Sequence, residues 1–352
     1  MEAWFRCVAG PSGAELAIFV GRDEAQSPLF IWPFEIVRRM GLRTMHWVGQ
    51  DHANYSMGLY QPEFAAAVGP DDMTALLQRA ASMAGGVKAA CFTDQPMIWD
   101  EIENPICLLP HQDSPNPGFA VRLDRDFDAI RRARFSKRSR QTLARKERRI
   151  ATYGTLEYGW AASPEDRLDV LETFFAQKSR RFRELGIPDA FADSIHRDFY
   201  RELAALDTSE PGHLRLGYLK VDDETVSTFN GIIFRNRLFV LLSSIIDGEL
   251  QRWSPGQLLL CHQIEDACER GLSHYDLGVG DAPHKLDWCD ERMSLIDSFI
   301  AFDVTGYVVT LTLAAKLALK RVIKTNPMLW ALARSVRRTI LRRSGSSAAE
   351  SV

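Results

Sequence analysis

Hydrophobic and polar residues follow two clear periods in the second half of the chain. Runs rich in β-branched and aromatic residues, separated by short polar turns, are typical of strands. Three such runs predict an antiparallel meander at residues 214–221, 225–234 and 237–246. Hydrophobic residues three and four positions apart are typical of helices. This second period predicts helices at residues 168–184, 194–206 and 257–270.

The segment after the meander has the order turn, helix, strand and loop. The meander ends at Asp247-Gly248, Ser254-Pro255-Gly256 opens the next helix, and a strand follows at residues 274–277. A helix that starts with proline and glycine leaves free backbone N–H groups pointing outward at its first turn. The helix dipole adds partial positive charge at the same end. Such a helix start binds anions, phosphate groups in particular. We therefore expect a phosphate-bearing ligand at the start of this helix.

The rest of the chain mixes both periods. Strands are expected at residues 15–20, 29–34, 45–48 and 87–92, with a helix at residues 73–83. Residues 113–118 are dense in turn formers, which is typical of a domain edge. Residues 124–152 are expected to form one basic helix, and residues 294–302 a late strand. A chain of 352 residues suggests two domains at roughly 150 residues each.

A set of motifs in the second half resembles a known family. The segment holds Ser254-Pro255-Gly256 followed by three leucines, then Tyr275-Asp276-Leu277-Gly278, Gly280-Asp281, His284-Lys285 and Trp288. In order and spacing these motifs resemble the acetyltransferase domain of the GNAT superfamily in its CelD-like branch, which is related to Fem-type acyltransferases. That branch is named for proteins linked to bacterial cellulose and exopolysaccharide synthesis. The resemblance is strong from about residue 135 to residue 303.

The resemblance implies an α/β fold with mixed α+β sheets, made of tandem GNAT-like halves and a basic helical C-terminal extension. It places a shortened first half at residues 1–119, the acyltransferase half at residues 120–303, and the basic helices and tail at residues 304–352. The implied activity is acyl-CoA-dependent N-acyl transfer, most simply of acetyl, to an amine of a sugar or polysaccharide-related acceptor. Acetyl-CoA or another acyl-CoA would be a cosubstrate, with no tightly bound cofactor. Two alternatives stay open: a Fem-type aminoacyltransferase, and a catalytically degenerate GNAT scaffold in polysaccharide synthesis.

Two departures from the family pattern affect the expected site. The family's pyrophosphate loop commonly reads Gln/Arg-x-x-Gly-x-Gly/Ala. Here Ser254 replaces the first glycine and Pro255 removes one amide donor, so the resemblance implies a phosphate held by fewer N–H groups and a hydroxyl. The tyrosine that commonly precedes the family's lysine is His284 here. With these changes, the resemblance implies that the acyl-CoA site consists of Gln251, Arg252, Ser254, Gly256 and Gln257.

Acidic and basic side chains gather after the strand at residues 274–277. Asp281, His284 and Lys285 follow that strand closely, and the edge where strands end is where α/β folds place ligand contacts. We expect Asp281 or His284 to accept the amine proton and Lys285 to bind an anionic group. The competing interpretation is structural, with Lys285 paired to Asp276 and Asp276 holding the loop.

The charges are strongly segregated along the chain. Residues 131–149 hold ten Lys or Arg residues and one acid, and residues 316–343 hold nine bases and no acid, in a chain of net charge −3. Segregation on this scale indicates an anionic ligand or surface, or basic helices packed on an acidic body. Arg138 on the first stretch, with Lys178 and Arg181 on the helix at residues 168–184, are candidates for acceptor binding. Nucleic-acid binding is not expected, because no recognised DNA or RNA module surrounds the basic helix.

The C-terminal region carries a basic amphipathic pattern. Apolar residues at helical spacing lie on one face of residues 329–340, and arginines between residues 334 and 343 lie on another. This pattern fits a helix that docks on the domain, and equally one that lies on an anionic membrane. The longest apolar run, residues 304–315, is shorter than the ~20 residues that a membrane span needs.

Two further features bear on compartment and metal binding. The chain starts without the basic and apolar regions of a signal peptide, so we expect a cytoplasmic protein. The basic C-terminal pattern adds the expectation of peripheral contact with the inner membrane. The six cysteines are scattered, with no metal-ligand spacing, so neither a metal site nor a disulfide framework is expected.

Overall fold

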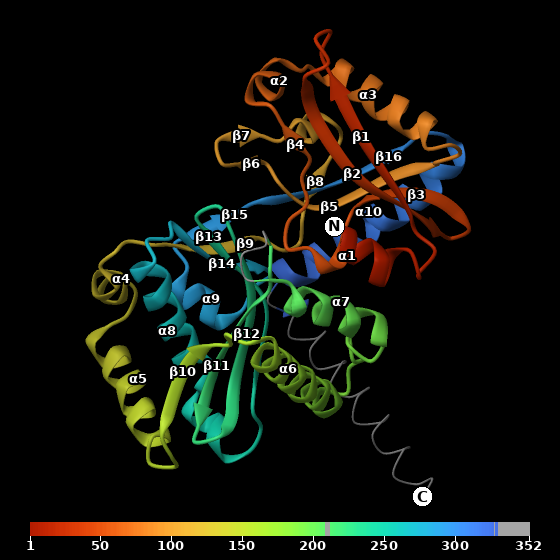
Figure 1. The fold of residues 1–352 in the computed structure, drawn as a ribbon. Coiled ribbons are helices and arrows are strands. Elements are labelled where there is room, and N and C mark those ends of the chain that lie inside the picture. Colours follow the sequence, from red (N-terminus) through yellow and green to blue (C-terminus); the bar gives the residue numbers. More distant parts are fainter. Residues whose placement is uncertain (208–211, 327, 330–352) are drawn as a thin grey trace, which may run out of the picture. The chain divides into compact units, whose positions relative to one another are not determined.

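The computed structural model describes residues 1–207, 212–326 and 328–329. These residues divide into two compact units (Figure 1). Unit 1 contains residues 1–118 and the described residues from Met293 onward, and unit 2 contains residues 119–292. Each unit has helices packed on a mixed sheet, as expected from the sequence.

Unit 1 is built on a sheet with the strand order β1-β2-β3-β5-β16-β8, and β4 pairs with β2. Most neighbours are antiparallel, whereas β3 and β5 run parallel. Helix α3 covers one side, where Met73 and Leu77 are buried against Trp32 and Phe34. The strands are β1 (Glu15–Arg22), β2 (Pro28–Arg39), β3 (Leu42–Trp47), β4 (Leu59–Tyr60), β5 (Ala89–Pro96), β8 (Gln112–Asp113) and β16 (Leu295–Ala301).

The helices of unit 1 and its small hairpin complete this half of the chain. Helix α10 packs on β5 and β16, with Val309 buried against Ala89 and Cys91. The elements are α1 (Glu2–Trp4), η1 (Phe5–Ala9), η2 (Gln50–His52), α2 (Pro62–Ala67), α3 (Pro70–Met83), β6 (Ile98–Trp99), β7 (Ile102–Glu103), η3 (Pro105–Leu108) and α10 (Val304–Thr325).

The place of β16 differs from the expected division of the chain. The sequence placed this strand in the second half, which was expected to end at residue 303. In the structure β16 pairs with β5 through six residue pairs from Leu295↔Pro96 to Ala301↔Ala89, and α10 follows it onto the same sheet. The boundary therefore lies between residues 292 and 293, and the first part of the basic extension belongs to unit 1.

Unit 2 contains the predicted meander. Strands β10 to β13 are antiparallel neighbours, and β14 pairs with β13 in parallel. The parallel register joins Arg237–Phe239 to His274–Asp276, and both strands run on beyond these pairs. The sheet order is β10-β11-β12-β13-β14-β9-β15, with β10 (Leu156–Trp160), β11 (Arg215–Val221), β12 (Glu224–Phe234), β13 (Arg237–Ile245), β14 (His274–Val279), β9 (Gly118–Arg122) and β15 (Glu291–Met293).

Helices cover both faces of this sheet (Figure 1). On one face α6 (Pro164–Leu185) and α7 (Ser194–Ala205) bury Phe174 and Phe175 against Leu216. The helix α6 begins with a capping box between Ser163 and Asp166 and ends at Gly186, whose φ of 59° is the left-handed conformation that glycine favours. On the other face α8 (Pro255–Glu269), preceded by η4 (Glu249–Trp253), packs its leucines on β12 to β14.

The expected basic helix at residues 124–152 is two helices, α4 (Phe127–Arg134) and α5 (Lys137–Ile150). The break falls at Phe135, which is extended, and Ser136, whose hydroxyl accepts the backbone N–H of Ser139 and caps α5. A serine cap stabilises a new helix start by about 1 kcal/mol, which favours the break. A short helix, α9 (Pro283–Trp288), follows β14.

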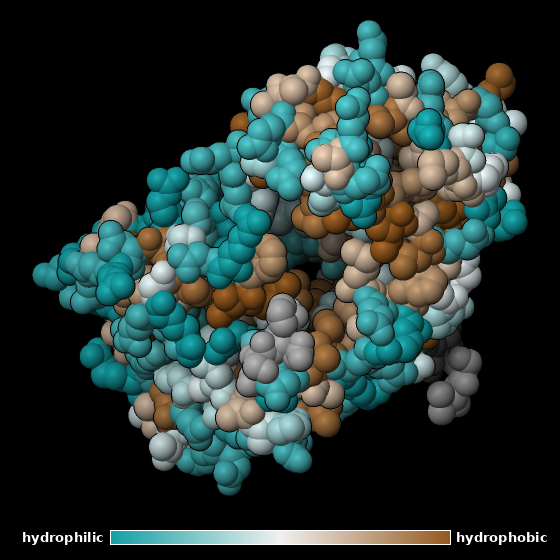
Figure 2. Space-filling model, turned by 45° about the horizontal axis from the view of Figure 1, so that its top comes forward, coloured by the Kyte–Doolittle hydropathy of each residue, from teal (hydrophilic) through white to brown (hydrophobic). Residues whose placement is uncertain are grey.

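Apolar side chains also reach the surface. Figure 2 shows hydrophobic residues gathered in patches between wide hydrophilic areas on the face that it draws. On α10 the exposed large side chains include Tyr307, Val308, Leu311, Leu319 and Val322. Among the described residues, no helix is both long and apolar enough to cross a membrane. The basic helix expected at residues 334–343 lies outside the described residues.

Candidate functional site

Two features at the start of α8 favour an anion, the free amide of Gly256 and the ammonium group of Lys146. Ser254 has a left-handed backbone with φ of 57°, and its carbonyl oxygen accepts the N–H groups of Gln257 and Leu258 at 2.9 and 3.2 Å. Within the described residues the N–H of Gly256 has no backbone acceptor. Lys146 Nζ donates to Ser254 Oγ at 2.8 Å, so an ammonium group stands at the positive end of the helix. The free amides expected here are thus reduced to Gly256, and a lysine from α5 supplements them.

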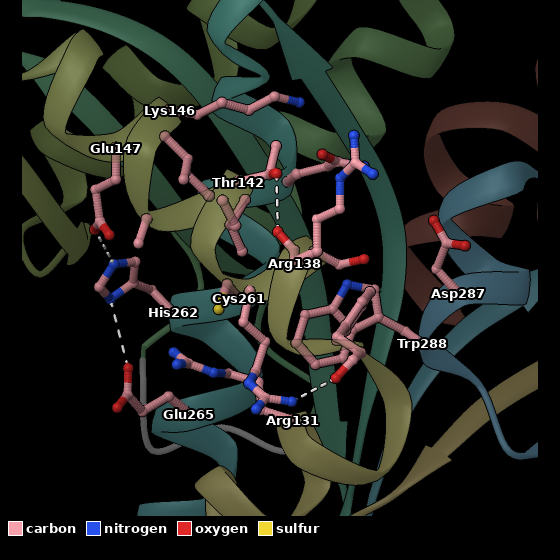
Figure 3. Close-up of a pocket in the computed structure, with 17 residues that line it drawn as sticks. Arg131, Arg138, Thr142, Lys146, Glu147, Cys261, His262, Glu265, Asp287 and Trp288 are labelled. Carbon is pink, nitrogen blue, oxygen red and sulfur yellow. Dashed lines mark hydrogen bonds and ion pairs between the residues drawn. The ribbon is translucent and has the colours of Figure 1, made fainter.

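A pocket of about 390 Å³ lies beside this helix start, between α5 and α8 (Figure 3). Helix α4 contributes Arg131, and α9 contributes Asp287 and Trp288. Four cations and three carboxylates line the pocket, together with one histidine and apolar side chains such as Leu143 and Leu258. The charged residues are Arg131, Arg138, Arg140, Lys146, Glu147, Glu265 and Asp287. The pocket therefore offers both anion-binding and cation-binding groups in one space.

One wall of the pocket is a row of carboxylate, imidazole and carboxylate (Figure 3). His262 Nε2 lies 3.0 Å from Glu147 Oε1, and its Nδ1 lies 3.7 Å from Glu265 Oε2. The ring of Tyr158 packs against that of His262 with 3.6 Å between ring centroids and a tilt of 30°, and the Tyr158 hydroxyl donates to the same Glu147 oxygen at 3.1 Å. Burial and the Glu147 carboxylate raise the pKa of Tyr158, so the phenol keeps its proton.

The residues expected after β14 fall into two groups. Asp276 is completely buried and pairs with Arg237 at 3.1 Å, while its other oxygen accepts the N–H of Gly278 at 2.8 Å, which supports its structural interpretation. Lys285 Nζ donates to the carbonyl oxygens of Gly278 and Val279 at 3.2 and 2.9 Å. Lys285 therefore fixes the loop and is already satisfied by backbone oxygens, and partial burial lowers its pKa.

Asp281 and His284 are exposed, on the loop after β14 and on α9. Both belong to the loop and short helix that also carry Asp287 and Trp288 into the pocket. Neither side chain is among the residues that line the α5–α8 pocket. Their proposed role in proton transfer remains a prediction.

The expected pyrophosphate residues are only partly brought together. Gln257 lines the pocket, and Ser254 and Gly256 form the helix start. Arg252 instead donates to the Tyr153 hydroxyl at 3.0 Å, pairs with Glu249, and lies 5.0 Å from the Trp253 ring centroid. Gln251 accepts the Ser254 N–H through its backbone oxygen at 3.0 Å, which shapes the turn before the helix.

The three acceptor candidates lie on two different elements. Arg138 lines the α5–α8 pocket. Lys178 and Arg181 lie on α6, which packs on the opposite face of the sheet from α8. Arg181 pairs with Glu184 at 3.2 Å, while the Lys178 ammonium lies 6.0 Å from the Phe182 ring centroid and has a pKa lowered by burial and by Arg181. The structure does not join these two residues to the pocket that contains Arg138.

Reasoning from the sequence missed Lys146, Glu147, His262 and Glu265. The spacing of His262 and Glu265 could have indicated their pairing, because they lie three positions apart on a predicted helix and therefore share one face. No local signal links Lys146 or Glu147 to α8, since the two segments lie more than 100 residues apart in the sequence. In the described part of the chain, no group of three or more His, Cys, Asp or Glu residues is placed to hold a metal ion.

Comparison with known proteins identifies the fold. Residues 137–286, from the start of α5 to α9, match the family model of the acetyltransferase (GNAT) domain. No curated protein matches the sequence of this chain. The matched segment covers less than half of the chain and includes α5, α8 and most of the residues that line the pocket.

Solved structures extend the similarity to both units. The chain resembles FemX with a TM-score of 0.61 and 12% identity, over 88% of this chain and 93% of that one. It also resembles the C-terminal domain of a putative lysylphosphatidylglycerol synthetase from Agrobacterium fabrum, with a TM-score of 0.53 and 13% identity over 89% and 94% of the two chains. These identities show a shared fold and do not carry the activities of those proteins to this chain. The fold is a mixed α/β fold of the GNAT type.

Proposed function

We propose that unit 2 is an acyl-CoA-dependent N-acyltransferase, most simply an N-acetyltransferase, that acts on an amine of a sugar or polysaccharide-related acceptor. One observation carries the proposal: at the start of α8, Lys146 Nζ lies 2.8 Å from Ser254 Oγ, within a segment that matches the GNAT acetyltransferase domain. A helix start with an added ammonium group suits a pyrophosphate, which carries negative charge on several oxygens.

In this proposal the pyrophosphate of the acyl-CoA is bound by Lys146, the Ser254 hydroxyl and the Gly256 N–H. Gln257 contributes from the next position of α8, and Gln251 and Arg252 hold the preceding turn in place. The lysine compensates for the amide donor that Pro255 removes. Acyl-CoA would then supply the activated thioester, and no covalent enzyme intermediate is needed.

Transfer of the acyl group requires removal of a proton from the amine as the C–N bond forms, and protonation of the departing thiolate. We assign this exchange to Asp281 or His284, which are exposed beside the loop fixed by Lys285. Arg138 supports the choice of an anionic or phosphorylated acceptor, because it lines the pocket as an exposed cation.

Calorimetric titration with acetyl-CoA and longer acyl-CoAs tests the proposal. Wild-type protein should bind, and Lys146→Met should weaken binding by about 10- to 100-fold, because a hydrogen bond to a charged group contributes about 1.5–3 kcal/mol. Lys137→Met is the matched control, since Lys137 is an exposed lysine on the same helix outside the pocket. Absence of acyl-CoA binding by the folded wild-type protein would refute the proposal and favour the Fem-type aminoacyltransferase alternative.

We also propose peripheral contact with anionic membranes through residues 334–343. One feature of the structure and one of the sequence support this proposal. Helix α10 exposes apolar side chains such as Tyr307 and Leu311, and the sequence of residues 316–343 holds nine bases and no acid. Apolar residues combined with basic ones are typical of helices that lie at a membrane surface.

A further inference from the structure

The hydrogen bonds of Glu147 determine which nitrogen of His262 carries a proton. Glu147 Oε1 faces the Tyr158 hydroxyl at 3.1 Å and His262 Nε2 at 3.0 Å. A carboxylate only accepts hydrogen bonds, and Tyr158 keeps its proton, so both neighbours donate to it. His262 is therefore protonated on Nε2, and in the neutral ring Nδ1 carries a lone pair.

The lone pair of Nδ1 faces a second acceptor. Glu265 Oε2 lies 3.7 Å from Nδ1, which is too long for a direct hydrogen bond even if the ring is charged. Two acceptors separated by this distance fit a single ligand nitrogen that donates one N–H to each. A primary amine or its ammonium form has this arrangement of donors, whereas a hydroxyl has only one proton to give.

A ligand can reach this position. The side chains of His262, Glu147 and Glu265 are 36%, 38% and 44% exposed, and all three line the α5–α8 pocket. Figure 3 shows His262 between the two carboxylates along one wall, with Trp288 across the pocket.

Two of the four cations that line the pocket interact with groups other than His262 and Glu265. Lys146 donates to Ser254 Oγ, and Arg131 lies 5.5 Å from the Phe127 ring centroid and 3.8 Å from Asp128. Asp287 lines the pocket from α9 and adds negative charge. Cys261 also lines the pocket, and burial raises the pKa of its thiol to about 12, so it stays neutral.

We propose that His262 and Glu265 bind the amine of the acyl acceptor, and that His262 Nδ1 takes the first proton from its ammonium form. This inference rests on the proposed N-acyl transfer and names the acceptor-amine position of that reaction. Glu265 balances the ammonium charge, and Glu147 is a positioning residue that holds the imidazole through Nε2.

The proton balance of the reaction follows from this assignment. The ammonium group gives one proton to Nδ1, and the neutral amine attacks the thioester carbonyl carbon. The C–N bond forms and the C–S bond breaks, while the second amine proton passes to the CoA thiolate. His262 then returns its proton to water. The products are an amide, the free thiol of CoA and one proton.

Histidine-labelled NMR of the full-length chain tests the amine position, with butylamine as the probe and butanol as its matched control. The chain has eight histidines, and the His262 ring resonance is identified by its loss in His262→Gln. Butylamine should shift this resonance saturably, and butanol should not. Glu265→Gln should weaken the response by ~10-fold or more, because it removes the charged partner. Glu269→Gln, an exposed acid at the end of the same helix, should leave the response unchanged.

No saturable shift with butylamine, or an equal response in Glu265→Gln, would overturn the inference.

Acetyl-CoA affinity, measured on the same samples, separates the two proposals. Acetyl-CoA binding without a response to butylamine refutes the amine position alone. A response to butylamine in protein that does not bind acetyl-CoA refutes the proposed N-acyl transfer instead.

Discussion

Replacement of Asp297 by asparagine should change how the stability of the protein depends on pH. Asp297 lies on β16 in unit 1 and is completely buried. Its Oδ1 accepts the backbone N–H of Asp94 at 3.0 Å, and its Oδ2 has no hydrogen-bond partner in the described part of the chain. Burial raises the pKa of this carboxyl from 3.8 to about 7, although the hydrogen bond from the Asp94 N–H opposes the increase. A pKa raised this far disfavours the charged form by about 4 kcal/mol.

The sign follows from the proton balance between the folded and unfolded chains. Between about pH 4 and pH 7 the folded chain keeps the Asp297 proton and the unfolded chain has lost it. The free energy of unfolding therefore falls as pH rises through this range, and the loss is complete above about pH 7. Asparagine cannot ionise, so Asp297→Asn removes this dependence. The stability of the variant relative to wild type should increase by up to about 4 kcal/mol between pH 4.5 and pH 8.

Denaturant unfolding of wild type and Asp297→Asn at pH 4.5 and pH 8 measures this difference. Asp113→Asn serves as the control, because Asp113 is an acid of the neighbouring strand β8 whose side chain is 82% exposed. General effects of pH cancel in the comparison between variants. The reasoning would be refuted if the stability gap between Asp297→Asn and wild type were the same at both pH values.

Three further predictions concern function. Gly256→Val should weaken acyl-CoA binding at least several-fold, since even a Cβ at this position would lie 2.9 Å from Ile245 Cγ2 and displace the start of α8; unchanged affinity in the folded variant would contradict this. Asp281→Asn should lower turnover by roughly 10²-fold with acyl-CoA affinity retained; wild-type turnover would remove Asp281 from the chemistry. Truncation after Thr325 should abolish co-sedimentation with anionic liposomes at low salt. High salt should abolish co-sedimentation of the full chain, because the Debye length falls to about 3 Å at 1 M. Co-sedimentation that changes with neither truncation nor salt would contradict the proposed membrane contact.

The elements of unit 2 were predictable because their signals are local. The meander, the helix opened by Ser254-Pro255-Gly256 and the strand after it depend on turn residues and periodicity within a few positions. Asp276 is buried and pairs with Arg237, which agrees with a structural role, whereas its expected partner Lys285 donates to two backbone carbonyl oxygens. The break between α4 and α5 was missed, although Ser136 is a local cap signal, because the basic pattern continues on both sides of it.

The pairing of β16 was not predictable in the same way. A strand at residues 295–301 is compatible with either sheet, and only its register with β5, about 200 residues earlier in the sequence, determines which sheet it joins. The same limit applies to the pocket. Periodicity indicates that α5 is basic all round, but it does not show that Lys146 and Glu147 are the residues that face α8.

The most direct test of the central claim is a crystal structure of the protein with bound acetyl-CoA. The proposed site predicts that the pyrophosphate lies at the start of α8, with its oxygens within hydrogen-bonding distance of Lys146 Nζ, Ser254 Oγ and the Gly256 N–H. Acetyl-CoA bound elsewhere in the chain, with the start of α8 unoccupied, would contradict the proposed site.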